Sequence, residues 1–189
     1  RAEAGRFRGV SFGDSRSARR KMSEVSPAWW GGIEMKGSFI VNGKKAEWSF
    51  APDAVLLDVL RNNGHTEVHR GCGEGECGAC AVILEGRLVN SCQVFAASAA
   101  GQKITTVAGI GSIHSPHPIQ QAFVEAGAIQ CGFCTPAMIL AVFCLLQKTP
   151  NPTDDEIRKA LDGNLCRCTG YVKIFEAVRL AARRMSSNE

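Results

Sequence analysis

The sequence predicts an α+β protein in which a small β-grasp domain is followed by an all-α domain, a four-helix bundle. Two observations carry this prediction. Between residues 35 and 108, short apolar or alternating segments are separated by tight-turn signals and by one helical segment. Beyond residue 118, apolar residues recur with helical spacing, and capping and breaking residues divide that stretch into four segments.

Two antiparallel hairpins and one helix are expected in the first domain, residues 35–108. The strongest turn signal is Asn42-Gly43, which favours a two-residue hairpin turn. A helix is expected over 54–62, with Asp53 as its N-cap. The expected strands are residues 36–41, 45–50, 81–84, 87–89 and 104–107.

Residues 109–118 are rich in Gly, Ser and Pro and are expected to link the two domains. Within the helical domain, 119–189, Thr135 is expected to cap a central helix that has Pro136 at its first position. That helix is apolar on all sides, so it should be buried. Thr153 and Glu156 have the spacing of a capping box. The four helices are expected at 119–126, from 135 to before Pro150, at 153–161 and at 171–185.

Residues 1–34 are expected to form a flexible, basic N-terminal extension. Residues 1–32 hold seven of the 22 Lys and Arg and three of the 18 acidic residues, which accounts for the whole net charge of +4. A docking arm that orders on a partner is the alternative. The rest of the chain is charge-balanced, so we expect no nucleic-acid partner. Arg19-Arg20 is followed by no apolar stretch, so we expect no export signal.

The composition is that of a globular protein. Hydrophobic residues make up 45% and charged residues 21%, which excludes a wholly disordered chain. The longest apolar run, residues 137–146, is far shorter than the ~20 residues that a membrane span needs. We therefore expect no membrane span and a cytoplasmic location, where cysteines favour metal or redox roles over disulfides.

Eight of the nine cysteines fall into two groups of four. The first group is Cys72, Cys77, Cys80 and Cys92. Its C-x4-C-x2-C spacing with a distant fourth cysteine is that of plant-type [2Fe–2S] ferredoxins, and the interleaved glycines allow a tightly wrapped loop. A zinc site and a disulfide framework are the alternatives. The spacing does not match paired zinc knuckles, and the chain is not a small secreted domain.

The second group is Cys131, Cys134, Cys166 and Cys168. Taken alone, its C-x2-C and C-x-C pairs suit either zinc or a second iron–sulfur cluster. One pair precedes the central helix and the other lies between the last two helices, so loops at helix ends would hold the group. A positive helix N-terminus nearby favours a cluster of net negative charge.

Three segments carry a resemblance to a known family: Gly71–Cys80, Gln130–Pro136 and Gly163–Tyr171. Together they resemble the small iron–sulfur subunit of the xanthine oxidase and xanthine dehydrogenase family of molybdenum hydroxylases. The resemblance covers residues 36–184. It implies two [2Fe–2S] clusters, one in a plant-type ferredoxin-like β-grasp domain and one in the helical domain. It also implies a large molybdopterin-binding partner subunit and, usually, a medium FAD-binding subunit.

The function implied is electron transfer within an oxidoreductase complex. Electrons would pass from the molybdopterin site on the large subunit through the two clusters towards FAD or another acceptor. No residue of this chain is expected to be catalytic, and the resemblance implies only that Gln130 contacts the pterin. Purines, N-heteroaromatics, aldehydes and carbon monoxide are all family substrates, and nothing in this chain selects among them. The alternative is a stand-alone two-cluster ferredoxin-type carrier.

The remaining candidate ligands are expected to be structural. His65 and His69 are loop residues near the first cysteine group, whereas His114 and His117 belong to the linker. The ninth cysteine, Cys144, lies in the apolar helix and is expected to pack as a small hydrophobic residue.

Overall fold

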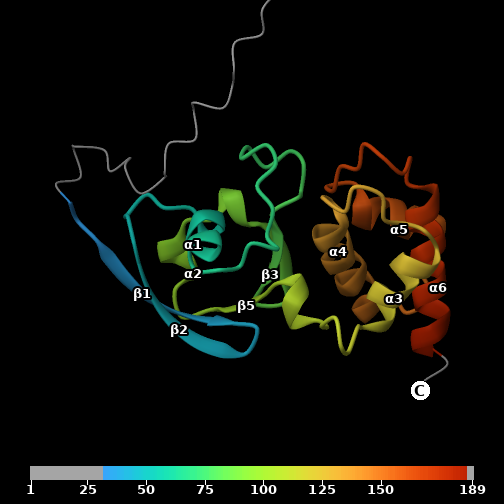
Figure 1. Cartoon of the computed structure of the whole chain (residues 1–189), viewed down its shortest axis with the longest axis horizontal. Coiled ribbons are helices and arrows are strands. Elements are labelled where there is room, and N and C mark those ends of the chain that lie inside the picture. The colour runs from blue at the N-terminus through green and yellow to red at the C-terminus, as the bar shows by residue number, and fades with distance from the viewer. Residues whose placement is uncertain (1–31, 187–189) are drawn as a thin grey trace, which may run out of the picture. The chain divides into compact units, whose positions relative to one another are not determined.

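A computed structural model describes residues 32–186 of the chain (Figure 1). The expectations for residues 1–31, which form most of the basic extension, and for residues 187–189 lie outside this range. Over the described residues, none of the helices has both the length and the apolar character that crossing a membrane requires.

The first half of the described chain is a five-stranded sheet in the order β2-β1-β5-β3-β4. Its strands are β1 (Met35–Val41), β2 (Lys44–Phe50), β3 (Ala81–Leu84), β4 (Arg87–Asn90) and β5 (Lys103–Thr105). The two predicted hairpins are the antiparallel pairs β1–β2 and β3–β4, and the first turns at Asn42 and Gly43, both with positive φ. Strand β5 joins them because it pairs parallel to β1 and antiparallel to β3.

Helix α1 (Leu56–Asn62) packs on this sheet and completes the predicted β-grasp domain (Figure 1). The core is a single cluster of side chains from α1 and the strands. Its fully buried large members include Phe39, Leu56, Leu60, Val82 and Ile104. A one-turn helix, α2 (Ala96–Ala99), and the 3₁₀ turns η4 (Ser91–Gln93) and η5 (Val107–Gly109) were not predicted.

The predicted start of α1 is wrong. The helix begins at Leu56 rather than residue 54, and Val55 stands at the N-cap with no side-chain capping hydrogen bond, so Asp53 does not cap it. The cause is tertiary, because Val55 forms an isolated antiparallel bridge with Phe95. The Leu56 N–H donates to the Val94 carbonyl at 2.7 Å. This pairing holds Val55 in an extended conformation that a helix cannot include.

The last strand also ends earlier than predicted, at Thr105 instead of residue 107. Thr106 is completely buried, and its N–H donates to Asn42 Oδ1 at 2.9 Å rather than to a neighbouring strand. A side chain from the first hairpin turn therefore ends the strand ladder.

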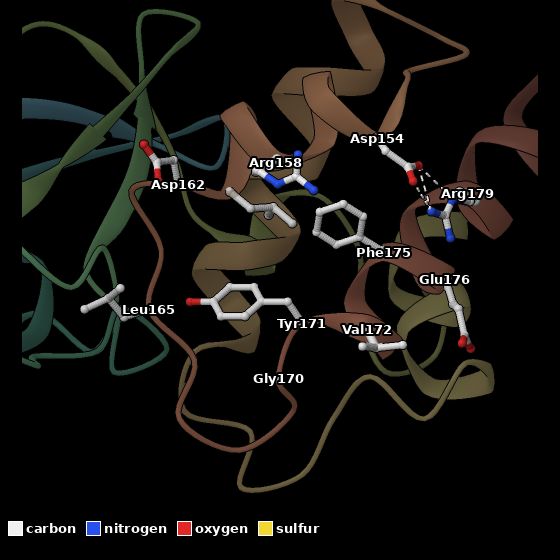
Figure 2. A pocket seen from close by; sticks show the side chains of 11 residues that line it. Asp154, Arg158, Asp162, Leu165, Gly170, Tyr171, Val172, Phe175, Glu176 and Arg179 are labelled. Carbon is white, nitrogen blue, oxygen red and sulfur yellow. Dashed lines mark hydrogen bonds and ion pairs between the residues drawn. The ribbon is translucent and has the colours of Figure 1, made fainter.

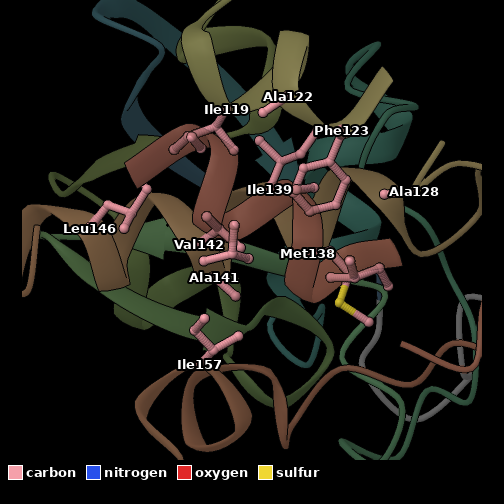
Figure 3. Packing of buried hydrophobic residues seen from close by; sticks show 14 of the residues in the cluster. Ile119, Ala122, Phe123, Ala128, Met138, Ile139, Ala141, Val142, Leu146 and Ile157 are labelled. Carbon is pink, nitrogen blue, oxygen red and sulfur yellow. The ribbon is translucent and has the colours of Figure 1, made fainter. Parts of the chain in front are cut away.

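The second half of the described chain consists of four helices, as predicted: α3 (Pro118–Glu125), α4 (Thr135–Lys148), α5 (Asp154–Leu161) and α6 (Val172–Ser186). They enclose a second core to which all four contribute, with Phe123, Met138, Val142, Ile157 and Ile174 among its members (Figure 3). Seven α4 residues are buried, as its all-round apolar character predicts.

Two capping predictions for these helices have different outcomes. The capping box that opens α5 is confirmed, because Thr153 Oγ1 accepts the Glu156 N–H and the Glu156 carboxylate accepts the Thr153 N–H at 2.7 Å. Thr135, by contrast, does not cap α4. The backbone is already right-handed helical at Cys134, and the Thr135 N–H donates to the Gly132 carbonyl at 3.2 Å. The turn of the loop that carries Cys131 and Cys134 thus leads directly into α4, without a side-chain cap.

His117 is the N-cap of α3 rather than a plain linker residue. Its Nδ1 accepts the Ile119 N–H at 3.2 Å, while Gln120 Oε1 accepts the His117 N–H at 2.8 Å. These two bonds form a capping box in which histidine takes the place of Ser or Thr. The His117 ring also meets Phe143 of α4 edge-on, with centroids 5.5 Å apart.

We expect His117→Ala to lower the free energy of unfolding by about 1 kcal/mol, the usual cost of losing an N-cap acceptor. His117→Asn, which keeps an acceptor, should recover most of it. Burial lowers the pKa of His117, so the folded state prefers the neutral ring. The contribution of His117 is therefore present above its ordinary pKa and is lost as pH falls through the lowered one. Urea unfolding at pH 7.5 and 5 measures both effects, and an equal loss for Ala and Asn would contradict the cap assignment.

Candidate metal centres

The first predicted cysteine group begins in the loop between α1 and β3. Cys72 Sγ accepts the N–H groups of Glu74 and Cys77 at 3.4 Å each, and Cys77 Sγ accepts the Cys72 N–H at the same distance. The Glu74 N–H, followed by the Cys77 N–H, lowers the pKa of the Cys72 thiol to about 6. Cys72 and Cys77 therefore face each other in a loop whose amides favour the thiolate form that binds metals.

The other two members of the first group form a buried pair. Cys80 and Cys92 are 3% and 5% exposed, and Cys92 is the cysteine that interacts with the Cys80 thiol. Burial raises the pKa of Cys80 to about 11, and the neighbouring Cys92 contributes to that rise. The side chain of Ser91 is buried too, and its Oγ donates to the Cys80 carbonyl at 2.7 Å. The four predicted cysteines thus comprise the exposed Cys72, the half-buried Cys77 and the buried pair Cys80 and Cys92.

Side chains that the sequence analysis did not single out hold this loop in shape. Asn90 Nδ2 donates to the Gly75 carbonyl at 2.9 Å, and Gln93 Nε2 donates to the Gly73 carbonyl at 3.3 Å and to Cys92 Sγ at 3.4 Å. Both flank Cys92, so the segment that brings the fourth cysteine also fastens the glycines between the first two. In the sequence, the closeness of Asn90 and Gln93 to the predicted ligand Cys92 was the one feature that could have indicated this role.

The second predicted group is also divided into two pairs. Sulfurs of Cys131 and Cys168 lie 3.5 Å apart, and Cys166 is the cysteine that interacts most strongly with Cys134. Each pair joins the loop before α4 to the loop before α6. Burial, and then the neighbouring Cys166, raises the pKa of Cys134 to about 12.

Cys166 is held by the turn that follows it. Burial opposes ionisation of Cys166, yet the hydroxyl and the N–H of Thr169, at 3.1 and 3.5 Å from Sγ, bring its pKa below the usual value. Tyr171, at φ +68°, accepts the Cys166 N–H on its hydroxyl at 2.9 Å and donates to the Asn164 carbonyl at 3.0 Å. A left-handed tyrosine is unusual, so this turn is specialised to place Cys166.

A two-by-two arrangement of thiols fits a [2Fe–2S] cluster. Such a cluster is bound by four cysteines, two for each iron, whereas a zinc ion gathers four ligands around a single point. Within residues 32–186, no three His, Cys, Asp or Glu side chains are grouped as one metal ion would require. The cysteines of each group instead interact most strongly in twos, an arrangement that suits a binuclear cluster.

The loops of the two groups touch each other. The Leu165 N–H donates to the Cys77 carbonyl at 2.9 Å, and Asn164 Nδ2, which is buried, donates to the Gly78 carbonyl at 3.1 Å. A Cβ on Gly78 would lie 2.1 Å from the Gly163 carbonyl oxygen, and Gly78 has φ +68°. Only glycine allows this approach, so the Gly163–Leu165 segment seats directly on the first loop.

The other predicted residues lie apart from the thiol pairs. Gln130 is exposed immediately before Cys131, and Cys144 is partly buried in α4, where burial raises its pKa.

A pocket of about 610 Å³ lies where α5, α6 and the turn after Cys168 meet (Figure 2). Its walls include Leu165, Phe175 and the ion pair between Arg179 and Asp154, but no cysteine. It borders the second cysteine group, because Leu165 precedes Cys166 and the Tyr171 hydroxyl accepts the Cys166 N–H.

Comparison with known families finds two matching domain models. Residues 39–104 match the 2Fe-2S iron-sulfur cluster binding domain, and residues 106–179 match the [2Fe-2S] binding domain. The chain is 49% identical over 148 residues to the nicotinate dehydrogenase small FeS subunit of Eubacterium barkeri. That alignment covers 78% of this chain and 94% of the relative.

Solved structures give the same result. Quinoline 2-oxidoreductase from Pseudomonas putida 86 has a chain that matches with a TM-score of 0.76 and 38% identity, covering 80% of this chain and 97% of that one. The aldehyde oxidoreductase of Desulfovibrio desulfuricans matches with a TM-score of 0.78 and 39% identity over 82% of this chain, which corresponds to 17% of that longer chain. The chain therefore belongs to the family of small iron–sulfur subunits of the xanthine oxidase and xanthine dehydrogenase family of molybdenum hydroxylases.

Proposed function

We propose that this chain is the electron-transfer subunit of a multi-subunit molybdenum hydroxylase. The observation that carries the proposal is the presence, in one chain, of two four-cysteine groups whose loops are in contact. A [2Fe–2S] cluster, when bound, accepts and releases one electron. The chain's own part is to bind the two clusters, to hold them at a fixed separation and to tune them through hydrogen bonds to sulfur.

In this proposal Cys72, Cys77, Cys80 and Cys92 would hold the first cluster. Cys131, Cys134, Cys166 and Cys168 would hold the second. The backbone N–H groups around Cys72 offset negative charge, and burial of the Cys80 pair keeps water from that side.

The partners follow from family membership. We infer a large molybdopterin-binding subunit and a medium FAD-binding subunit, with substrate chemistry on the large subunit. Relatives bear the names of enzymes that act on nicotinate, quinoline and aldehydes, so the substrate is selected outside this chain. That the same fold makes up 17% of a longer aldehyde oxidoreductase chain supports a role inside a larger enzyme. The stand-alone ferredoxin-type carrier is not favoured.

We also infer a cytoplasmic location and a division into domains at residues 35–108 and 119–189.

The test is purification of the chain with its native partners. We expect about four iron and four acid-labile sulfide per chain, a brown colour, and co-elution with a larger subunit that contains molybdenum. Stoichiometric zinc with little iron would refute the cluster assignment. A brown chain that elutes alone and monomeric from freshly lysed cells would refute the subunit assignment.

We expect Gln130→Ala to slow reduction of the clusters by substrate about fivefold while both clusters still assemble. Gln130 is exposed beside Cys131, and a side-chain amide both donates and accepts, which suits the edge of a pterin. Losing one neutral hydrogen bond costs on the order of 1 kcal/mol. Stopped-flow reduction of the assembled enzyme measures the rate, and Gln121→Ala, on the exposed side of α3, is the control. An unchanged rate in Gln130→Ala would contradict the pterin contact.

A further inference from the structure

His69 and Phe133 are 64 positions apart and in direct contact. The rings are stacked, with centroids 4.8 Å apart and planes at 15°. His69 Nδ1 lies 2.7 Å from the Phe133 carbonyl oxygen. Because that oxygen can only accept, Nδ1 carries the hydrogen and donates it. One side chain thus makes both a polar and a ring contact with a residue of the other cysteine loop.

Each of the two residues lies close in sequence to the cysteines of one candidate centre. His69 precedes Cys72 by three positions, and Phe133 lies between Cys131 and Cys134. The Phe133 ring also reaches the first loop itself, because a Cβ on Gly71 would lie 3.7 Å from Phe133 Cε1. Phe133 therefore covers the segment that enters the first cysteine group.

The backbone on either side of His69 is held firmly by α1. Arg61 Nη1 donates to the carbonyls of Thr66 and Val68 at 3.0 and 2.7 Å. Arg70 forms an ion pair with Asp58, and the side chain of Val68 is buried. His69 consequently projects from an anchored segment, which makes it a fixed point for a neighbouring loop.

The contact completes the attachment between the two loops. On one side, Leu165 and Asn164 fasten the Cys166–Cys168 turn to the first loop through Cys77 and Gly78. The His69–Phe133 contact fastens the Cys131–Cys134 turn to the same loop. Each thiol pair of the second group takes one cysteine from each of these turns. Both halves of the second centre are thus tied to the first.

We propose that His69 is a positioning residue for electron transfer between the two clusters, acting through Phe133. By holding the Cys131–Cys134 turn against the first loop, it keeps the two clusters at a constant separation. The rate of electron tunnelling falls steeply with distance, so a loop that opens part of the time transfers electrons more slowly. The inference rests on the proposed function, because it requires that both cysteine groups bind clusters.

Three substitutions separate the contributions of His69. His69→Ala removes the ring and the donor. His69→Asn removes the ring but keeps an N–H donor near the position of Nδ1, and His69→Phe keeps a ring but removes the donor. His114→Ala is the matched control, since His114 is an exposed histidine of the 109–118 segment.

The experiment uses the full chain with both clusters in place. Iron and sulfide are first measured in every variant. The magnetic interaction between the two reduced clusters is then read from electron paramagnetic resonance, and amide hydrogen exchange is measured at Thr135, whose N–H donates to the Gly132 carbonyl. In His69→Ala we expect unchanged iron content and unchanged individual signals, but a weaker interaction and exchange about fivefold or more faster, since one neutral hydrogen bond and a ring contact are lost. His69→Phe should fall between Ala and the parent, and His69→Asn should stay within about twofold of the parent.

The possible failures are distinct. If the parent chain holds about four irons and His69→Ala leaves both the interaction and the exchange unchanged, the positioning role is refuted while the proposed function stands. If His114→Ala changes them as much as His69→Ala does, the positioning role is refuted as well. A parent chain without iron and sulfide refutes the proposed function, and the inference with it.

Discussion

Replacing Cys166 with Ser should remove about half of the iron and one of two paramagnetic signals from the reduced protein, and replacing Cys80 with Ser should remove the other half and the other signal. The reason is that each cysteine belongs to a different group and interacts with cysteines of that group, Cys134 for Cys166 and Cys92 for Cys80. A serine oxygen is a poorer ligand for iron than a thiolate. Iron analysis and electron paramagnetic resonance measure both changes.

Cys144→Ser is the matched control for these two substitutions. Cys144 lies in α4 outside both groups and is partly buried, so its loss should leave about four irons in place. Circular dichroism in the far ultraviolet verifies that each variant has kept its helices. If Cys166→Ser abolished both signals in a chain that is still folded, the two groups would not be independent centres. If Cys144→Ser lowered iron as much, the assignment of eight ligands would be wrong.

Gly78→Ala should destabilise the chain more than the same substitution at the other glycines of the first loop. Gly71 is left out of this comparison because a Cβ there would meet the Cys77 sulfur. A Cβ there would lie 2.1 Å from the Gly163 carbonyl oxygen and 2.6 Å from Asn164 Nδ2, and both belong to the segment that joins the two loops. A left-handed residue with a Cβ costs about 1–2 kcal/mol, and forced overpacking adds about 1–3 kcal/mol. We therefore expect a loss on the order of 3 kcal/mol together with a weaker interaction between the clusters.

Gly86→Ala separates the two causes. Gly86 also has a positive φ, +76°, but a Cβ there would meet nothing within 4 Å. It should cost only the conformational part, about 1–2 kcal/mol, and leave the clusters unaffected. Urea unfolding of the two variants side by side gives the comparison. If both variants lost the same free energy of unfolding, the close packing of Gly163–Leu165 on Gly78 would contribute nothing to stability.

The features that the sequence determined are those with local causes. The turn at Asn42 and Gly43 was predictable because these two residue types favour the positive φ angles that a two-residue hairpin turn needs, whatever the surrounding structure. The capping box of Thr153 and Glu156 satisfies the helix start within four residues. The spacing of Cys72, Cys77 and Cys80 is local in the same sense, since one short glycine-rich loop must present three thiolates.

Predictions that depended on a distant partner were wrong or could not be made. Asp53 looks like a helix cap until Phe95 draws Val55 into a bridge. His117 sits in a segment with the composition of a linker, and its capping role needed the ring to turn towards Ile119. A signal was present, because Pro118 at the first helical position and Gln120 two residues later are typical of a capped helix start.

The sequence by itself determined that there are two groups of four cysteines, one in a β-grasp domain and one among four helices. The tertiary structure alone decided which thiols face each other and how the two loops meet. Cys92 reaches Cys80 because β3 and β4 pair, and Cys168 reaches Cys131 because the loops that precede α4 and α6 meet. Gly78 accommodates Asn164, and His69 meets Phe133, across 86 and 64 positions of chain. Such contacts leave no periodic signal in a sequence. The free energy that they cost and the free energy that they contribute both arise only once the two cores have packed.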